Sequence, residues 1–180
     1  MNFIKEIIYR IRGEYTTEKL IKMGLNVGKN FKRLNGVILD PSHCWLITIG
    51  NNVTMAPRVH ILAHDASTKT FLDYTKIGCV NIGDNVFIGA ESVVLPGITI
   101  GNNVIIGANS TVTHNIPDNS IAVGSPAKVI CSLDDYLTKE KSRMNSSIIY
   151  DDDFTLGGNI SDEKKQQQAK ELKDRIGYVK

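Results

Sequence analysis

The sequence lacks the features that mark a secreted, disulfide-stapled or membrane-spanning protein. Its three cysteines, Cys44, Cys79 and Cys131, are odd in number, widely spaced and without a CxxC pair. This usage fits a reducing compartment. The N-terminal stretch MNFIKEIIYRIRGEY is interrupted by charges such as Lys5 and Arg10, so it has neither a signal-peptide core nor a bilayer span. We therefore expect a cytoplasmic protein with no membrane span.

An excess of one charge is also missing. The chain carries 21 lysines and arginines against 19 aspartates and glutamates, which gives a net charge of +2. Such a balance produces no field that would attract nucleic acid or an anionic membrane. The 180 residues, 42% of them hydrophobic, suffice for one buried domain with a terminal appendage.

What the sequence does contain is a repeat of six residues. One set of positions in phase is Ile82, Ile88, Val94, Ile100, Ile106 and Val112, and a second set, four residues later, is Val86, Ser92, Ile98, Val104, Ser110 and Ile116. Neither the helical period of 3.6 nor the strand period of 2 produces this spacing. Short strands joined by tight turns and stacked into a solenoid do produce it, with both sets pointing inward. Glycine or asparagine is expected at the tight turns.

The repeat also runs upstream, with two interruptions. Ile49, Met55 and Ile61 share one phase. Between Ile61 and Ile82 there are three residues more than three hexads allow, so HDASTKTFLDYTKIGC must leave the coil as a loop. The segment DPSHCWL shifts the phase again. Function is usually carried where a regular scaffold is interrupted.

These patterns divide the chain into three parts. Residues 1–24 form an N-terminal helical cap, with one helix from the apolar face of residues 3–11 and a second in TTEKLIKMG, begun by a capping threonine. Residues 25–131 form the all-β solenoid, with a loop at 65–79. Residues 132–180 form a helical C-terminal extension with an irregular acidic segment, YDDDFTLGGN, between two helices.

The stretch IGDNVFIGAESVVLPGITIGNNVIIGANSTVTHNIPDNSIAVGSPAKVI resembles the hexapeptide-repeat O-acetyltransferases, the family of galactoside, maltose and capsular acetyltransferases. The resemblance covers roughly residues 25–131 and includes an AP-x-V coil, a histidine before the loop and a final GSPAKVI. It implies a left-handed parallel β-helix, a homotrimer with active sites between neighbouring solenoids, and acetyl-coenzyme A as donor. The implied acceptor is a hydroxyl of a sugar or polysaccharide precursor.

His64 is the residue expected to act as general base. Transfer of an acetyl group to a hydroxyl needs a group that removes the hydroxyl proton, and histidine titrates near neutral pH. His64, in ILAHDAS, stands at the mouth of the loop, where the family's catalytic histidine lies. Spacing alone leaves a local hydrogen-bonding role equally open. The partner that orients the ring is either Asp65, which more readily caps the turn, or a backbone carbonyl.

The resemblance also assigns a donor site. The residues that it implies for coenzyme A are Ala90, Ala108, Thr113, His114 and Lys128. Small side chains let an extended pantetheine arm approach the backbone, and a lysine offers charge for a phosphate. A purely structural need for small residues at the turns is the alternative, and as isolated observations these residues favour it. Relatives often carry a second basic residue where this chain has Cys131.

For the acceptor, Asn35 and Asp40 resemble the asparagine and the acidic residue that hold sugar hydroxyls in galactoside-type enzymes. A turn residue is the alternative role for Asn35. Trp45, the only tryptophan, either stacks on a sugar face or packs in the core, and the core is favoured. His43 could approach the acceptor pocket.

Other functions stay open at this stage. Carbonic anhydrases of similar repeat use histidine-bound zinc, but the spacing of His60 and His64 suits a helix rather than a solenoid, so no metal is expected. Acetylation of serine or of an antibiotic, N-acylation of an amino sugar, and a non-catalytic trimeric scaffold are the remaining alternatives.

Overall fold

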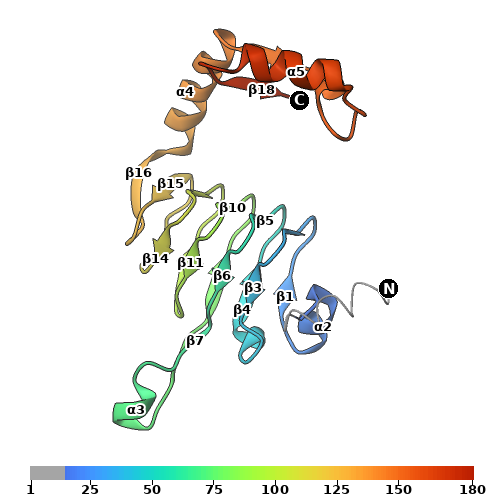
Figure 1. Ribbon diagram of the computed structural model, residues 1–180. Helices are drawn as coiled ribbons and strands as arrows, with labels where there is room; N and C mark the ends of the chain where they lie inside the picture. Colours follow the sequence, from blue (N-terminus) through green and yellow to red (C-terminus); the bar gives the residue numbers. More distant parts are fainter. Residues whose placement is uncertain (1–14) are drawn as a thin grey trace. The chain divides into compact units, whose positions relative to one another are not determined.

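The computed structural model describes residues 15–180, which fall into two compact units divided between Leu133 and Asp134. The helix predicted over residues 3–11 lies outside the described residues. In Figure 1 the first unit is a stack of short strands and the second is mostly helical. Within the described part of the chain, no helix combines the length and the apolar character needed to cross a membrane.

The first unit is a parallel β-solenoid with three faces, each formed by one sheet. Sheet A has the order β1 (Asn26–Val27), β4 (Ile47–Ile49), β9 (Val80–Ile82) and β12 (Thr99–Ile100). Sheet B has the order β2 (Lys32–Arg33), β5 (Thr54–Met55), β10 (Phe87–Ile88), β13 (Ile105–Ile106), β15 (Ser120–Val123) and β16 (Lys128–Ser132). Sheet C has the order β3 (Ile38–Leu39), β6 (His60–Ile61), β11 (Val93–Val94) and β14 (Thr111–Val112).

The chain visits the three sheets in the order A, B, C and then begins the next coil. Each strand pairs in parallel with the strand one coil away, for example Ile38 with His60 and Leu39 with Ile61. Only β16 runs antiparallel to its neighbour in these three sheets, where it closes the last coil against β15. Consecutive sheets are joined at three corners, which we name A–B, B–C and C–A.

The core confirms the six-residue period. All twelve residues of the two predicted phases are buried, with exposures between 0% and 6%. Ile49, Met55 and Ile61 continue the same column and are also buried. Two members are serines, Ser92 and Ser110, and they bond to each other through the Ser110 amide and the Ser92 hydroxyl at 3.3 Å. A pattern confined to short sequence distances thus specifies a core that extends through the whole unit.

Asparagine and glycine meet different backbone constraints in the solenoid: asparagine takes positive φ angles at a corner, and glycine allows close approach of neighbouring coils. Asparagines carry the positive φ angles at the A–B corner, and their side chains form a ladder in which each amide NH₂ donates to the next carbonyl oxygen at 2.9 to 3.0 Å. The ladder consists of Asn30, Asn52, Asn85, Asn103 and Asn119.

Gly89 has an ordinary φ, but a Cβ there would lie 2.4 Å from the backbone nitrogen of Ala108 in the next coil. Glycine at this position is therefore required by the spacing of the coils.

The N-terminal end of the core is covered by helix α2 (Thr17–Lys22). Thr16 caps it by accepting a hydrogen bond from the Lys19 amide at 3.2 Å, as the sequence predicts, and Leu20 is fully buried beneath it. The chain leaves the helix through Gly24, whose φ of +109° favours glycine.

Both predicted interruptions lie at the C–A corner. The first contains a 3₁₀ helix, η1 (Cys44–Leu46). The second is a hairpin of β7 (His64–Asp65) and β8 (Lys76–Ile77), with the short helix α3 (Lys69–Leu72) at its tip. This hairpin extends away from the stacked coils in Figure 1. The insertion is larger than the three extra residues that the hexad count predicts. Strand β9 directly follows β6 in the coil, so the residues between these two strands form no coil of their own and belong to the insertion.

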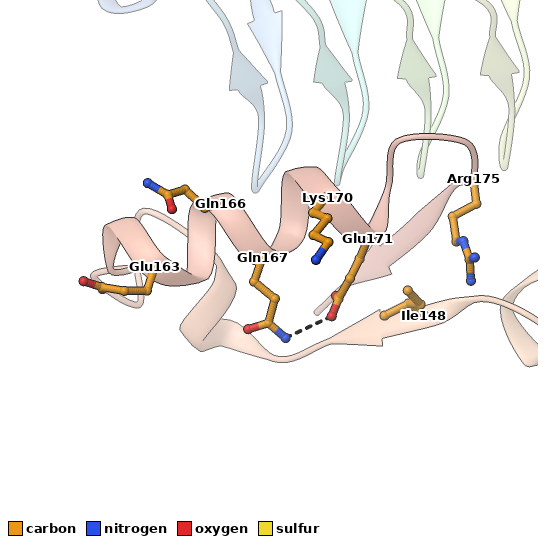
Figure 2. A pocket seen from close by; sticks show the side chains of 7 residues that line it. All are labelled: Ile148, Glu163, Gln166, Gln167, Lys170, Glu171 and Arg175. Atoms are coloured by element: carbon orange, nitrogen blue, oxygen red, sulfur yellow. Dashed lines mark hydrogen bonds between the residues drawn. The ribbon is translucent and has the colours of Figure 1, made fainter.

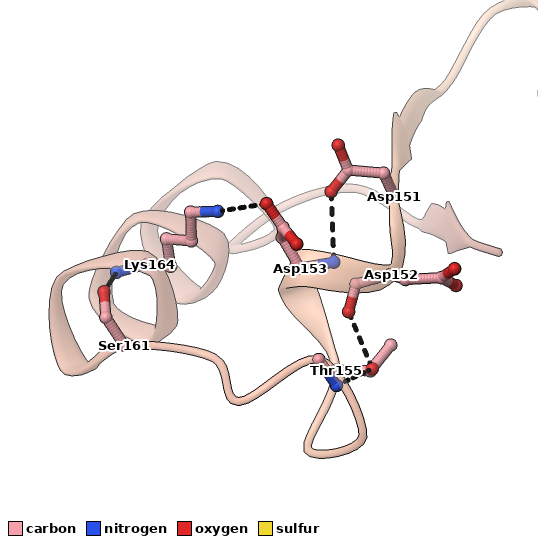
Figure 3. A network of polar contacts seen from close by, with 7 residues as sticks. Asp151, Asp152, Asp153, Thr155, Ser161 and Lys164 are labelled. Atoms are coloured by element: carbon pink, nitrogen blue, oxygen red, sulfur yellow. Dashed lines mark hydrogen bonds and ion pairs between the residues drawn. The ribbon is translucent and has the colours of Figure 1, made fainter.

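The second unit contains the two helices that the sequence predicts, α4 (Leu133–Asn145) and α5 (Asp162–Glu171). It also contains the 3₁₀ helix η2 (Asp152–Phe154) and a parallel pair that sequence reasoning missed, β17 (Ile148–Tyr150) with β18 (Gly177–Val179). Figure 3 shows the polar contacts of the acidic segment. Lys164 forms an ion pair with Asp153 at 3.1 Å, and Ser161 caps α5 by accepting from the Lys164 amide at 3.3 Å. These contacts order the segment that the sequence predicts as irregular.

Candidate active site

His64 and Asp40 meet at the C–A corner. Leu39 of β3 pairs with Ile61 of β6, so the residues that follow these two strands emerge side by side from successive coils. The Nδ1 atom of His64 is in direct hydrogen-bond contact with Oδ2 of Asp40. The Asp40 side chain is 1% exposed and that of His64 is 34% exposed. A buried carboxylate therefore lies behind an imidazole that solvent can reach.

Two backbone amides fix the Asp40 carboxylate. Its Oδ1 accepts from the Ser42 amide at 3.0 Å, and its Oδ2 accepts from the Ala63 amide at 3.0 Å. Because the carboxylate also contacts Nδ1 of His64, the tautomer with the proton on Nδ1 is favoured and Nε2 is left as the basic nitrogen. The same arrangement of carboxylate, imidazole and free ring nitrogen supports general base catalysis in other enzymes.

The two acidic residues named by the sequence analysis, Asp40 and Asp65, have different outcomes in this geometry. Asp40 was expected to hold the acceptor, but its buried oxygens are engaged by Ser42, Ala63 and His64. Of the two roles open to Asp65, orienting the imidazole or capping the turn, the structure bears out the second, which the sequence favours: its carboxylate accepts from the Ser67 amide at 2.9 Å and pairs with Lys76 at 3.0 Å. The hydrogen bonds from Ser67 and the ion pair with Lys76 lower the pKa of Asp65 to about 2. Asp65 is thus an anchor of the hairpin.

A second imidazole, that of His43, lies next to His64, and the Trp45 indole lies next to His43. The ring of His43 is 5.2 Å from that of His64 and 5.2 Å from that of Trp45, measured between centroids. Trp45 is 56% exposed, so the prediction that it packs in the core is wrong. The 3₁₀ turn places it at the surface, because the extra residues of this corner lie outside the repeat that points side chains inward.

The cluster also has the composition of a metal site. Asp40, His43 and His64 each offer one ligand atom, and these atoms lie within 4.8 Å of one another. This set differs from the pair His60 and His64 that the sequence suggested for consideration. The hydrogen bonds of Asp40 to two amides and one imidazole account for its position without a metal.

The predicted donor residues are divided between corners. Ala90 and Ala108 follow strands of sheet B and lie at the B–C corner, whereas Thr113 and His114 follow β14 and lie at the C–A corner. The Thr113 hydroxyl contacts Nδ1 of His114 at 2.8 Å. Lys128 is exposed at the start of β16. A single chain therefore does not bring the five predicted residues into one site.

The predicted acceptor residues are also separated. Asn35 is exposed at the B–C corner, where its backbone carbonyl accepts from the Arg58 amide at 3.1 Å. Asp40 lies at the C–A corner, one strand further along the same coil. The resemblance to galactoside-type enzymes implies a shared role for the two residues, but within one chain strand β3 separates them.

The second unit has hollows of its own. One has a volume of about 610 Å³ and is lined by the seven residues drawn in Figure 2, among them Lys170, Glu171 and Arg175. Glu171 accepts from the Gln167 amide group at 3.0 Å and from the Tyr150 hydroxyl at 2.7 Å. The lining contains none of the residues predicted to bind donor or acceptor.

Comparison with known proteins agrees with the repeat. Residues 79–114 match the family described as bacterial transferase hexapeptide (six repeats). The chain is 41% identical over 155 residues to Protein CapG of Staphylococcus aureus, an alignment that covers 82% of this chain and 84% of CapG.

Two solved structures are similar over a shorter region. A maltose O-acetyltransferase from Clostridium difficile 630 has 42% identity and a TM-score of 0.55, with 61% of this chain and 59% of that chain covered. A hexapeptide-repeat acetyltransferase from Vibrio cholerae, complexed with acetyl-coenzyme A, has 26% identity and a TM-score of 0.55, with 61% of each chain covered. The similarity thus spans less than two thirds of either solved chain.

Proposed function

Since this chain belongs to the hexapeptide-repeat acetyltransferases, it is an enzyme of acetyl transfer, and we propose that it transfers the acetyl group of acetyl-coenzyme A to a hydroxyl of a sugar or polysaccharide precursor. The observation that carries this proposal is the pair of His64 and Asp40. A partly exposed imidazole held by a buried carboxylate suits removal of a hydroxyl proton. The complex of the Vibrio cholerae relative with acetyl-coenzyme A supports the choice of donor.

In the proposed mechanism, the acceptor oxygen attacks the thioester carbonyl while Nε2 of His64 takes the hydroxyl proton. A tetrahedral intermediate forms, and the imidazolium is stabilised by the Asp40 carboxylate at Nδ1. The intermediate then breaks its carbon–sulfur bond, and the departing thiolate of coenzyme A receives the proton from Nε2. The products are the acetyl ester and free coenzyme A, and His64 returns to its neutral form.

The proposal includes a homotrimer of left-handed solenoids, with each donor site completed by a neighbouring copy. The placement of the predicted residues supports it, because Ala90 and Ala108 lie at a different corner from His64. A copy that presents its B–C corner to this chain's C–A corner would unite them. Asn35, at the B–C corner, would then approach the acceptor from that copy. Thr113 and His114 would line the same groove.

Three further parts belong to this proposal. Lys128 is exposed and offers a cation for a phosphate of coenzyme A. The proposed domains of the chain are an N-terminal cap over residues 1–24, a solenoid over 25–131 and a C-terminal extension over 132–180. We place the enzyme in the cytoplasm, because Cys44, Cys79 and Cys131 are all free thiols.

A panel of hydroxyl acceptors tests the proposed function. The purified protein, acetyl-coenzyme A and one acceptor at a time are incubated, and release of the coenzyme A thiol is followed together with the mass of the acceptor. We expect thiol release that depends on a saccharide and a mass gain equal to one acetyl group. Preferential acetylation of serine, of an antibiotic or of an amino group would redirect the proposal, and binding of acetyl-coenzyme A without transfer to any acceptor would contradict it.

The variant Asp40→Asn tests the role of the buried carboxylate. The amide removes the negative charge that stabilises the imidazolium, so we expect kcat to fall by about 100-fold or more. The KM for acetyl-coenzyme A should stay the same, because the carboxylate lies behind the imidazole and acts on the acceptor step only. Asp65→Asn is the matched control, since Asp65 anchors the hairpin only, and should keep most of the wild-type kcat. An unchanged kcat in Asp40→Asn would remove Asp40 from the mechanism.

A further inference from the structure

The segment that interrupts the coil before β4 carries two aromatic side chains, those of His43 and Trp45, to the C–A corner where His64 lies. It runs from Pro41 to Leu46 and includes η1. Cys44 in this segment is fully buried, whereas Trp45 is 56% exposed. In a tight 3₁₀ turn, neighbouring side chains point in different directions, so the burial of Cys44 directs its neighbours outward.

Helix α2 holds this segment in place. The Cys44 thiol lies 3.7 Å from the Leu20 carbonyl oxygen and 3.6 Å from the Met23 carbonyl oxygen, near the C-terminal end of the helix. A Cβ at Gly24 would lie 2.8 Å from the Cβ of Trp45, so the glycine allows the two backbones to approach closely. The base of the indole is therefore fixed by the end of α2, although its ring is exposed.

His43 connects the indole to the catalytic imidazole. Its ring contacts both of the other rings, with tilts of 46° to Trp45 and 40° to His64. Its Nδ1 is buried without a hydrogen-bond partner among residues 15–180. Burying this nitrogen without a hydrogen bond costs free energy. The contacts with Trp45 and His64 on its two sides therefore hold the His43 ring in place. The centroid of the Trp45 ring therefore lies at most twice 5.2 Å from the centroid of the His64 ring.

We propose that Trp45 is a stacking platform for a pyranose ring of the acceptor, with His43 setting the distance between this platform and His64. The inference rests on the proposed function and deepens it by naming the class of acceptor. A pyranose has an apolar C–H face and a rim of hydroxyls, and an exposed indole can cover that face while one rim hydroxyl reaches a neighbouring base. A small acyclic acceptor such as serine presents no such face.

The single tryptophan makes binding directly observable. Because the chain has one Trp, all tryptophan fluorescence comes from Trp45. Methyl pyranosides of the acceptor panel are titrated into wild-type protein and into His64→Ala, each in the presence of coenzyme A. We expect a saturable change of emission in both proteins for the same pyranosides, and no change with serine.

Steady-state kinetics give the second measurement. Trp45→Ala is expected to raise the KM for the pyranoside by about ten-fold or more, while the KM for acetyl-coenzyme A stays constant. Trp45→Phe keeps an aromatic face and should recover most of the loss. Ile38→Ala is the matched control, since Ile38 is an exposed apolar side chain of β3 on the same coil, and should leave both KM values unchanged.

The outcomes separate this inference from the proposed function. Transfer to a pyranoside with no fluorescence change, and with equal KM values in wild type and Trp45→Ala, would overturn the platform and leave the transferase intact. Absence of any acetyl transfer by wild type would contradict the proposed function, and the titration with pyranosides would still decide whether Trp45 binds them. If Trp45→Ala does not fold, the comparison of Trp45→Phe with wild type and the wild-type titration decide the question.

Discussion

His64→Ala is expected to lower kcat for acetyl transfer by about 100- to 10,000-fold, the range that a general base contributes. The variant loses the Nε2 atom that takes the hydroxyl proton, and the Asp40 carboxylate loses its ring partner. The measurement is thiol release from acetyl-coenzyme A with the best acceptor of the panel. The KM for acetyl-coenzyme A should change little, because the imidazole acts on the acceptor hydroxyl.

The control for this variant is His60→Ala. His60 is a partly exposed residue of β6 on the same strand that leads to His64, and it takes no part in the proposed chemistry. It should retain nearly all of the wild-type kcat. Thermal unfolding of both variants separates a catalytic loss from a loss of fold. A folded His64→Ala protein that transfers acetyl groups at the wild-type rate would show that another group is the base.

Gly89→Ala is expected to destabilise the solenoid by about 3 kcal/mol or more, at the upper end of what overpacking costs. The added Cβ would lie 2.4 Å from the backbone nitrogen and 2.7 Å from the Cα of Ala108. Both atoms belong to the backbone of the next coil, which no rotamer change can move. Relief would require the coils to separate, and separation would weaken the hydrogen bond from the Gly89 amide to the Ile106 carbonyl, now 2.8 Å. Chemical denaturation of the variant measures the effect.

Gly107→Ala, in the same unit, is the comparison variant, in which the added Cβ meets a side chain instead of the backbone. Its Cβ would approach only side-chain atoms of Val123 closely, at 2.7 Å for Cγ1, and a valine side chain can shift. We therefore expect a smaller loss of stability than for Gly89→Ala. Equal denaturation midpoints for Gly89→Ala and wild type would mean that the coil spacing does not impose glycine at this position.

Much of the fold follows from local sequence patterns. The hexad identifies the buried column because each inward position is a fixed number of residues from the last, as Ile82, Ile88 and Val94 show. Helix α2 is predictable because Thr16 caps a short amphipathic run. The pair β17 and β18 was missed because its strands are separated by α5 and joined only through tertiary contacts.

The candidate site likewise has features that local sequence patterns predict and features that depend on tertiary contacts. The sequence by itself determined the six-residue period, the two places where it breaks and His64 as the candidate base, since each depends on residue type and spacing over a few positions. Only the tertiary structure decided that Asp40 lies behind His64 and that Trp45 is exposed and packs against His43. The physical reason is that both interruptions change the register between coils. The contact between residues 24 positions apart therefore depends on how each insertion folds, which no local period encodes.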